Sequence, residues 1–263
     1  MTRHASRRIR HELVFRTLQV QAIEQLTPSM KRIVVGGEGL RGFRSDSPDD
    51  HIKLFFPNQD GELVFPTMGA NGPAYARGAK PSPMRDFTPR QHDRERQQLV
   101  LDFARHDAGP AAAWAAQARV GQTLGVGGPR GSHIVANDFE HYVLVGDETA
   151  LPAIGRWIEE KRHDAPITAL IEIPADADRQ PLQLAANAQV TWLPRNGAHA
   201  ATSNALEHAL RSLPTPFGDT FYWIAAESHR VRAMRRQLIE QRGVPGDFIR
   251  ATGYWQADAQ HHG

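Results

Sequence analysis

The segment Arg85-Asp86-Phe87-Thr88-Pro89-Arg90 concentrates residue types that suit an anionic ligand carrying an aromatic ring. Two arginines five positions apart in an extended stretch can reach different parts of one anion, since a guanidinium offers paired donors that match a phosphate. Between them, Phe87 offers a flat face and Thr88 a hydroxyl that can bond to a ring nitrogen. By itself, however, the segment is more typical of a surface strand with solvated arginines, so the binding hypothesis needs support from the rest of the chain.

A second candidate site begins at His106 and Asp107 and continues through Ala111, Ala112 and Trp114. It follows a strand-like stretch and is expected to open a helix, where small residues let backbone N–H groups approach a phosphate. The helix dipole also favours negative charge at that end. An ordinary alanine-rich helix has the same composition, so both interpretations stay open.

A third candidate, the segment from Val145 to Ala153, lies at the turn between a predicted strand and a predicted helix, a position typical of nucleotide binding. It lacks the glycines of a dinucleotide fingerprint, and its two carboxylates would repel phosphate. On its residues alone it is a helix cap made by Asp147 or Thr149. Two further segments each contain one candidate cation. The turn 127–132 contains Arg130, and the terminal strand 248–255 contains Arg250.

The first half of the chain is expected to consist of short strands separated by glycine-rich turns, which is typical of an antiparallel barrel or sandwich. The predicted strands are Leu13–Ile23, Lys31–Val35, His51–Phe56, Gln98–Arg105 and Gln122–Val126. One long segment rich in Gly and Pro, Asn58 to Met84, interrupts them. A loop of that length in a compact domain is usually functional or disordered.

The second half alternates between strand-like and helix-like stretches, which predicts a parallel sheet with helices on both faces. The last predicted helix, 228–243, has Ser228 as its expected N-cap and Gly243 as its stop. We therefore predict a β-barrel domain over residues 1–136 and an α/β domain over residues 137–263. Ligands of such a sheet bind beyond the carboxyl ends of its strands.

Composition excludes several classes of function. The chain of 263 residues has no cysteine, which rules out disulfides, thiolate metal sites and a cysteine nucleophile. Its net charge is +2, from 31 basic and 29 acidic residues, whereas a nucleic-acid binder usually has a stronger basic excess. No apolar run approaches the roughly 20 residues of a membrane span, and the basic N-terminus lacks the apolar core of a secretory signal. The histidines show no metal-ligand spacing, so we expect no bound metal. From all these features together we expect a cytoplasmic protein that neither enters a membrane nor binds nucleic acid.

Taken in order along the chain, these segments resemble the siderophore-interacting proteins, which are flavin-dependent ferric-chelate reductases of the ferredoxin–NADP⁺ reductase superfamily. The likeness covers nearly the whole chain and rests on 50–57, 85–90, 106–114, 128–132, 146–152 and 253–255. It implies an antiparallel FAD-binding barrel followed by a parallel-sheet domain that binds NAD(P)H.

The resemblance also implies roles for single residues. The residues implied to bind the cofactor are Arg85, Asp86, Phe87, Thr88, His106, Asp107, Ala111, Ala112, Trp114, Asp147, Thr149 and Ala150. A basic triad implied to receive an anionic siderophore consists of Lys53, Arg130 and Arg250. Phe87 stands where a tyrosine is usual, so it should bind the flavin by stacking alone, with Arg85 and Thr88 as the polar anchors.

The resulting hypothesis is that NAD(P)H, with NADPH favoured, reduces FAD, which then reduces Fe(III) in a ferric siderophore or a ferric citrate-type chelate. No catalytic acid or base is needed, and we expect a monomer. The alternatives are a general flavin or ferredoxin reductase and a siderophore-binding carrier without reductase activity. Arg230, Arg232 and Arg235 can meet the 2′-phosphate of NADPH or form a solvated helix face, and the sequence favours neither.

Overall fold

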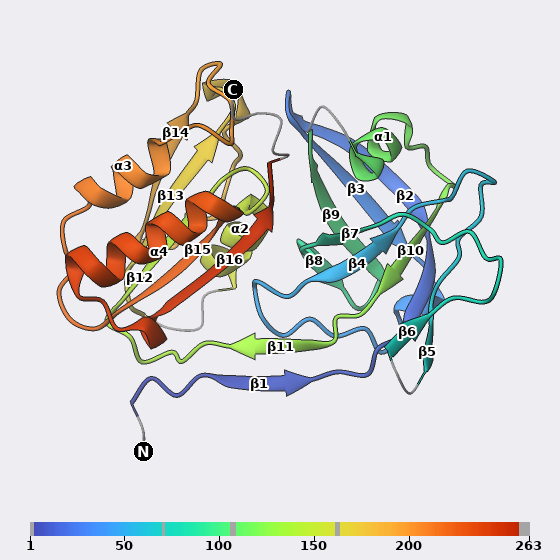
Figure 1. Cartoon of the computed structure of the whole chain (residues 1–263), viewed down its shortest axis with the longest axis horizontal. Coiled ribbons are helices and arrows are strands. Elements are labelled where there is room, and N and C mark those ends of the chain that lie inside the picture. Colours follow the sequence, from blue (N-terminus) through green and yellow to red (C-terminus); the bar gives the residue numbers. More distant parts are fainter. Residues whose placement is uncertain (1–2, 70–71, 106–108, 161–163, 258–263) are drawn as a thin grey trace. The chain divides into compact units, whose positions relative to one another are not determined.

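The computed structural model describes residues 3–69, 72–105, 109–160 and 164–257, and the chain divides into two compact units. The barrel unit comprises the described residues of 8–26 and 30–134 (Figure 1). The α/β unit comprises those of 1–7, 27–29 and 135–263. Each unit has its own hydrophobic core and is described by itself.

The barrel unit is a curled antiparallel sheet of seven strands in the order β7-β4-β10-β2-β3-β9-β8. Its longest strand, β2, alternates buried Leu18 and Val20 with exposed neighbours, as expected of a sheet with one face on the core. The elements are β2 (Phe15–Thr27), β3 (Met30–Gly36), β4 (Ile52–Phe55), β7 (Met84–Phe87), β8 (Gln91–Asp93), β9 (Gln98–Ala104), α1 (Pro110–Gln117) and β10 (Thr123–Gly127). The predicted antiparallel barrel is thus confirmed as a curled half-barrel.

Three small features accompany the curled sheet. The segment expected to be irregular, 58–84, contains a short hairpin of β5 (Thr67–Gly69) and β6 (Gly72–Ala74). A one-turn helix, η1 (Glu38–Leu40), follows β3. Near the start of the chain, β1 (Arg7–Arg10) pairs with β11 (Gly131–Ile134) in a separate two-stranded sheet.

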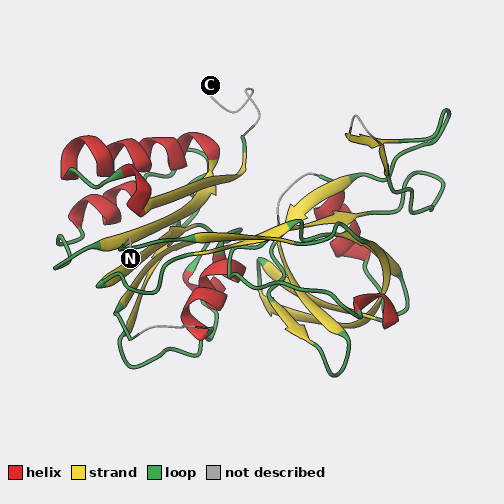
Figure 2. Cartoon of the chain, turned by 90° about the horizontal axis from the view of Figure 1, so that it is seen from below, coloured by secondary structure: helices red, strands yellow, loops and turns green. Residues whose placement is uncertain are grey.

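The α/β unit is built on a five-stranded parallel sheet in the order β14-β13-β12-β15-β16. Helix α2 covers one face of the sheet, and α3 and α4 cover the other, with a separate apolar core under each layer (Figure 2). The strands are β12 (His141–Gly146), β13 (Ile167–Ile173), β14 (Ala188–Pro194), β15 (Thr220–Glu227) and β16 (Ile249–Trp255). The helices are α2 (Leu151–Glu159), α3 (Ala205–Ser212) and α4 (Ser228–Arg242), with one-turn helices η2 (Asp176–Asp178) and η3 (Gly246–Phe248).

The order of the strands creates a switch point. From β12 the chain adds β13 and β14 on one side, then returns and adds β15 and β16 on the other. In open parallel sheets, ligands bind outside the carboxyl ends of the two strands that flank such a reversal. Here those strands are β12 and β15.

The ends of α4 test two sequence predictions. Gly243 does end the helix, in the left-handed conformation at φ 65° that glycine adopts without steric cost. The predicted N-cap was wrong by one residue, because Ser228 is the first residue of the helix. Glu227 is the cap, and its carboxylate accepts hydrogen bonds from the backbone N–H groups of His229 and Arg230.

In the part of the chain that the structure describes, no helix combines the length and the apolar character needed to cross a membrane.

Candidate functional site

Lys53 and Asp86 form an ion pair across two neighbouring strands of the barrel unit. Strand β4 pairs antiparallel with β7 so that Lys53 lies opposite Asp86. Their side chains are 45% and 55% exposed, and Lys53 Nζ lies 2.8 Å from Asp86 Oδ1. The structure thus brings together a residue predicted to bind the siderophore and one predicted to bind the cofactor.

A chain of aromatic rings joins the first two candidate segments. Phe87, the last residue of β7, packs against Phe103 with ring centroids 4.6 Å apart, and Phe103 packs against Trp114 of α1 at 5.7 Å. Trp114 is only 6% exposed and also contacts Phe56, so it is a core residue that anchors α1. The segments 85–88 and 111–114, which are separate in sequence, therefore share one aromatic cluster in the barrel unit.

The first turn of α1 was predicted to approach a phosphate group, and its N-cap residue is a glycine. Gly109 is the N-cap residue at φ 120° and has no side chain to bond to the N–H groups of Ala111 and Ala112. Pro110 occupies the first turn, as predicted from its fixed φ. Among the described residues no side chain caps this turn, and backbone N–H groups at a helix N-terminus can bind an anion. His106 and Asp107, which were predicted to bind the cofactor as well, lie outside the described residues.

The two arginines of the segment 85–90 have different surroundings. Arg85 is exposed on β7, and its Nη1 donates to the neighbouring backbone carbonyl of Met84, at 2.8 Å. Arg90 is mostly buried, and its Nε lies 3.9 Å from the carboxylate of Asp102, which also accepts a two-pronged bond from Arg32. The expectation that both arginines reach one anion is therefore not met, since Arg90 is turned toward a buried carboxylate. Arg85 and the buried Thr88 remain as the polar groups of the segment.

Of the three predicted siderophore-binding cations, two belong to the barrel unit. Strand β10 pairs with β4 so that Gly127 lies opposite Lys53, and the exposed Arg130 follows three residues later. Arg250 belongs to the α/β unit, where it lies on β16 opposite Trp223 and is half-buried. Convergence of all three on one chelate stays a prediction.

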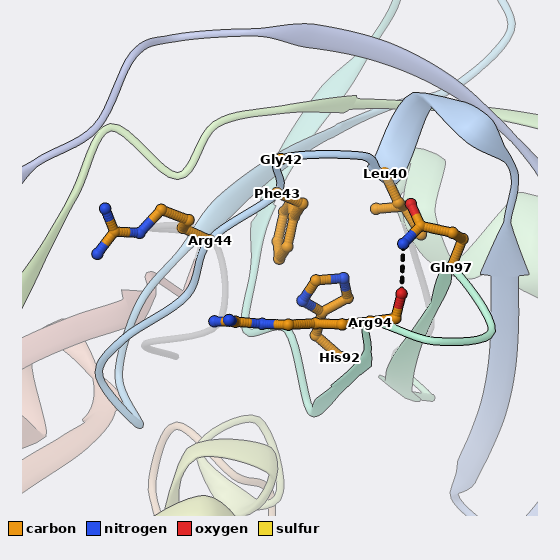
Figure 3. A pocket seen from close by; sticks show the side chains of 7 residues that line it. All are labelled: Leu40, Gly42, Phe43, Arg44, His92, Arg94 and Gln97. Carbon is orange, nitrogen blue, oxygen red and sulfur yellow. Dashed lines mark hydrogen bonds between the residues drawn. The ribbon is translucent and has the colours of Figure 1, made fainter.

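The barrel unit also has a cavity of about 360 Å³ away from these segments (Figure 3). Leu40 and the ring of Phe43 form its apolar lining, and the Phe43 ring meets His92 edge to face at 4.8 Å. The rest of the lining consists of Gly42, Arg44, Arg94 and Gln97. None of the described residues that were predicted to bind a cofactor or siderophore lines this cavity.

In the α/β unit, Asp147 lies directly after β12, at the switch point. Its side chain is completely buried, and its Oδ1 accepts bonds from Thr149 N at 2.9 Å and Thr149 Oγ1 at 2.5 Å. Its Oδ2 accepts a bond from Trp255 Nε1 at 2.8 Å. Burial, together with the neighbouring charge of Glu148, raises the pKa of Asp147 to about 6, although these hydrogen bonds act in the opposite direction. Ala150, also predicted to bind a nucleotide, is fully buried just before α2.

A buried network of ion pairs lies at the same edge of the sheet. Arg195 forms a two-pronged pair with Glu148 at 2.6 and 2.7 Å and lies 3.3 Å from Glu172. Arg230 forms a second two-pronged pair with Glu172, at 2.8 Å for both bonds, and also pairs with Glu207. Arg230 is therefore committed to carboxylates and is not available for a 2′-phosphate. Arg232 and Arg235, in contrast, lie on the exposed face of α4.

The sequence did not indicate this network or the contact between Asp147 and Trp255. The partners are separated by 108 positions for Asp147 and Trp255 and by 58 for Glu172 and Arg230, so no local pattern links them. The available signal was a set of carboxylates and arginines at the predicted strand ends, which parallel pairing brings to one edge.

Known protein families match both units. The family model described as "Siderophore-interacting FAD-binding domain" matches residues 19–133, and the one described as "Siderophore-interacting protein" matches residues 139–258. The NADPH-dependent ferric-chelate reductase of Escherichia coli is 36% identical over 253 residues, which is 95% of this chain and 96% of that protein. The ferric vibriobactin reductase of Vibrio cholerae is 30% identical over 235 residues, which is 88% of this chain and 85% of that protein.

Solved structures show the same architecture. A siderophore utilization protein from T. fusca has a TM-score of 0.88 and 39% identity, covering 98% of this chain and 100% of its own. A ferredoxin NADP⁺ reductase from Neisseria gonorrhoeae, with bound FAD and NADP, has a TM-score of 0.61 and 14% identity, covering 92% and 99% of the two chains. The second likeness concerns the fold alone.

Proposed function

The chain belongs to the siderophore-interacting protein family, and from that membership we propose that it is an FAD-dependent, NADPH-oxidising ferric-chelate reductase. Its substrate is an anionic ferric siderophore or ferric citrate-type chelate. Each NADPH gives up two electrons, and Fe(III) in the chelate is reduced to Fe(II). Because Fe(II) binds hard oxygen ligands more weakly than Fe(III), reduction releases the iron.

The observation that carries this proposal is the shared aromatic cluster of β7 and α1. It supports one cofactor site in which Phe87 offers a ring face and Arg85 and Thr88 offer polar anchors. In this proposal the first turn of α1, which no described side chain caps, holds the pyrophosphate. Bound FAD would supply the acceptance of a hydride and the release of single electrons. The protein's own residues then have only to bind and orient the cofactor and the substrate and to shield them from water. A sequence without cysteine agrees with this, because no residue of the chain has to carry electrons.

Exposed cations support an anionic iron chelate as the substrate. Lys53 and Arg130 lie on neighbouring segments of the barrel unit, and Arg250 is the third cation of the proposed triad. Positive charge at the mouth of a site raises the local concentration of an anion and speeds its association. We propose that these three side chains receive the chelate.

For the co-substrate, we propose that NADPH docks at the switch point of the α/β unit, beside the turn formed by Asp147, Thr149 and Ala150. The exposed Arg232 and Arg235 are the candidates for its 2′-phosphate, since Arg230 is occupied by Glu172 and Glu207. We further expect the protein to act as a monomer in the cytoplasm.

The test is to purify the protein, load it with FAD and record absorbance at roughly 450 nm, the band of oxidised flavin. Steady-state assays then compare NADPH with NADH on ferric citrate and on a ferric catecholate, with Fe(II) trapped by a coloured chelator. We expect bound flavin and NADPH-dependent Fe(II) formation. Turnover with free flavin or ferredoxin but not with ferric chelates would instead identify a general reductase. Chelate binding that persists without FAD and without NADPH oxidation would identify a carrier.

A further inference from the structure

Trp255 is hydrogen-bonded, through its indole and through its backbone, to residues that follow two other strands at the carboxyl edge of the parallel sheet. Its Nε1 donates to Asp147, which follows β12, at 2.8 Å. Its backbone carbonyl accepts a bond at 2.9 Å from Oγ of Ser228, which follows β15. The last residue of β16 is therefore fixed to the ends of both strands that flank the switch point.

The end of β16 is shaped to allow this. The pairing with β15 shifts at Glu227, so Trp255 rather than Tyr254 lies opposite that residue. Such a bulge re-aims side chains at the end of a strand. Gly253 makes the close approach possible, because a Cβ there would lie only 3.0 Å from the Cα of Ser228. Tyr254 packs instead into the apolar core, edge to face with Trp223 at 6.1 Å.

The hydrogen bonds of Asp147 restrict the orientation of the indole. Both of its oxygens are used, Oδ1 by Thr149 and Oδ2 by Trp255, and the carboxylate is fully buried. A bond from N–H to a buried carboxylate is stronger than a neutral one, and losing it would leave the carboxylate oxygen without that donor. The orientation of the indole is therefore coupled to the carboxylate. Trp255 as a residue is only half-buried, so part of its surface stays accessible.

We propose that Asp147 is a positioning residue that, through Trp255, holds the indole ring as the contact surface for a planar ring of the pyridine dinucleotide. This inference rests on the proposed use of NADPH and deepens it by naming what the dinucleotide ring meets at the switch point. A stacked pair of aromatic rings contributes about 1 kcal/mol beyond its buried area, which corresponds to a several-fold change in affinity. The ring contributes fully only while its plane is fixed.

The decisive experiment is a double-mutant cycle on the full chain loaded with FAD, read out as the Kd of NADP⁺ by titration calorimetry. Trp255→Phe keeps a ring but lacks the N–H donor, and Asp147→Ala removes the acceptor. Each should weaken NADP⁺ binding by up to about fivefold, because the ring is kept but its plane is no longer fixed. The double variant should be no weaker than either single variant, because Asp147 acts only through the indole. Trp192→Phe, at a half-buried tryptophan of β14, is the matched control and should leave the Kd unchanged.

Kinetics separate this role from a merely structural one. In Asp147→Ala and Trp255→Phe the KM for NADPH should rise, while kcat changes by less than about twofold and the KM for the ferric chelate is unaltered. Quenching of tryptophan fluorescence by NADP⁺ should fall in Trp255→Phe and stay normal in Trp192→Phe. If Asp147→Ala does not fold, the comparison of Trp255→Phe with Trp255→Ala decides, since both lose the bond and only the second loses the ring.

Several results would overturn the inference. These are an unchanged Kd in both single variants, effects that multiply in the double variant, or a wild-type chain that binds no NADP⁺. A wild-type chain that binds NADP⁺ but forms no Fe(II) would contradict the proposed reductase activity instead. In that case the binding cycle would still decide the role of Asp147.

Discussion

The ion pair between Lys53 and Asp86 distinguishes Lys53 from Arg130, the other cation of the barrel unit that is proposed to bind the chelate. The positive charge that Lys53 offers an anionic chelate is offset by the carboxylate of Asp86, 2.8 Å away. Arg130 is exposed, and among the described residues its side chain has no ion pair. The two cations should therefore differ in their effect on substrate binding.

We predict that Arg130→Ala raises the KM for an anionic ferric chelate more than Lys53→Ala does. Asp86→Asn should lower that KM, because it frees Lys53. Exposed ion pairs contribute about 0.2–1 kcal/mol, so the Asp86→Asn effect should be up to about fivefold. The control is Lys80→Ala, which removes an exposed lysine paired with Asp60 on the same unit. Equal KM values for Asp86→Asn and the wild-type protein would show that Lys53 does not meet the chelate.

His4 holds the N-terminal segment to the α/β unit as a charged ring. Its Nδ1 lies 2.9 Å from Asp138 Oδ1 and its Nε2 lies 3.0 Å from Asp219 Oδ2. Only the doubly protonated ring can donate to both carboxylates. The ring is 5% exposed, stacks on Phe139 at 3.9 Å, and Arg3 also pairs with Asp219.

This arrangement predicts a pH dependence of stability. Burial lowers the pKa of His4, but its bonds to Asp219 and Asp138 outweigh burial and raise the pKa above 6.5. Because the pKa is raised on folding, the added stability is fully present below about pH 6.5 and is lost as the pH rises through the raised value. His4→Ala should therefore destabilise the protein at about pH 6 and much less at about pH 9. Urea unfolding across this range checks the prediction, with His208→Ala, an exposed histidine of α3, as control. A difference that does not change with pH would contradict it.

Charged side chains gather at the carboxyl ends of the parallel strands, although the strands themselves are largely apolar. Glu148, Glu172 and Glu207 lie there with Arg195 and Arg230 in one buried network. Breaking a buried pair by removing one partner costs about 3–5 kcal/mol, because an uncompensated charge is left in the interior. The network therefore fixes the ends of β13 and β14 and the start of α4 against one another.

We predict that Arg230→Met destabilises the protein by about 3 kcal/mol, since Glu172 loses its two-pronged partner inside the unit. Arg232→Met, on the exposed face of the same helix, should change stability by less than about 0.5 kcal/mol. Thermal and urea unfolding of the two variants measure the difference. An Arg230→Met variant as stable as the Arg232→Met variant would show that the network contributes little.

What the sequence predicted, and what it did not, follows from the range of the interactions. Gly243 could be identified as the end of α4 because a left-handed residue is a local requirement that glycine meets. Glu227 was missed as the cap because Ser, Thr, Asp and Asn are the usual caps. The pairing of Lys53 with Asp86 depends on the register of β4 and β7, which no local pattern fixes.

For the whole molecule, the alternation of short strands followed by strand–helix repeats was enough to predict two architectures in the correct order. The order of the candidate segments along the chain was enough to indicate the family, although each segment alone was ambiguous. The contact between Asp147 and Trp255 joins β12 to β16, and it could be recognised only once the order of the strands was known. The packing of Phe87 on Phe103 and of Phe103 on Trp114 is likewise a product of the folded barrel.

The central claim is that electrons from NADPH reach chelated iron through a flavin on this chain. The most direct measurement mixes the FAD-loaded protein, without oxygen, with a limiting amount of NADPH and an excess of ferric chelate, and counts Fe(II). Since NADPH gives up two electrons and each iron takes one, we predict two Fe(II) for every NADPH consumed, and none when FAD is left out. NADPH oxidation without Fe(II), or Fe(II) formation that does not need FAD, would contradict the account.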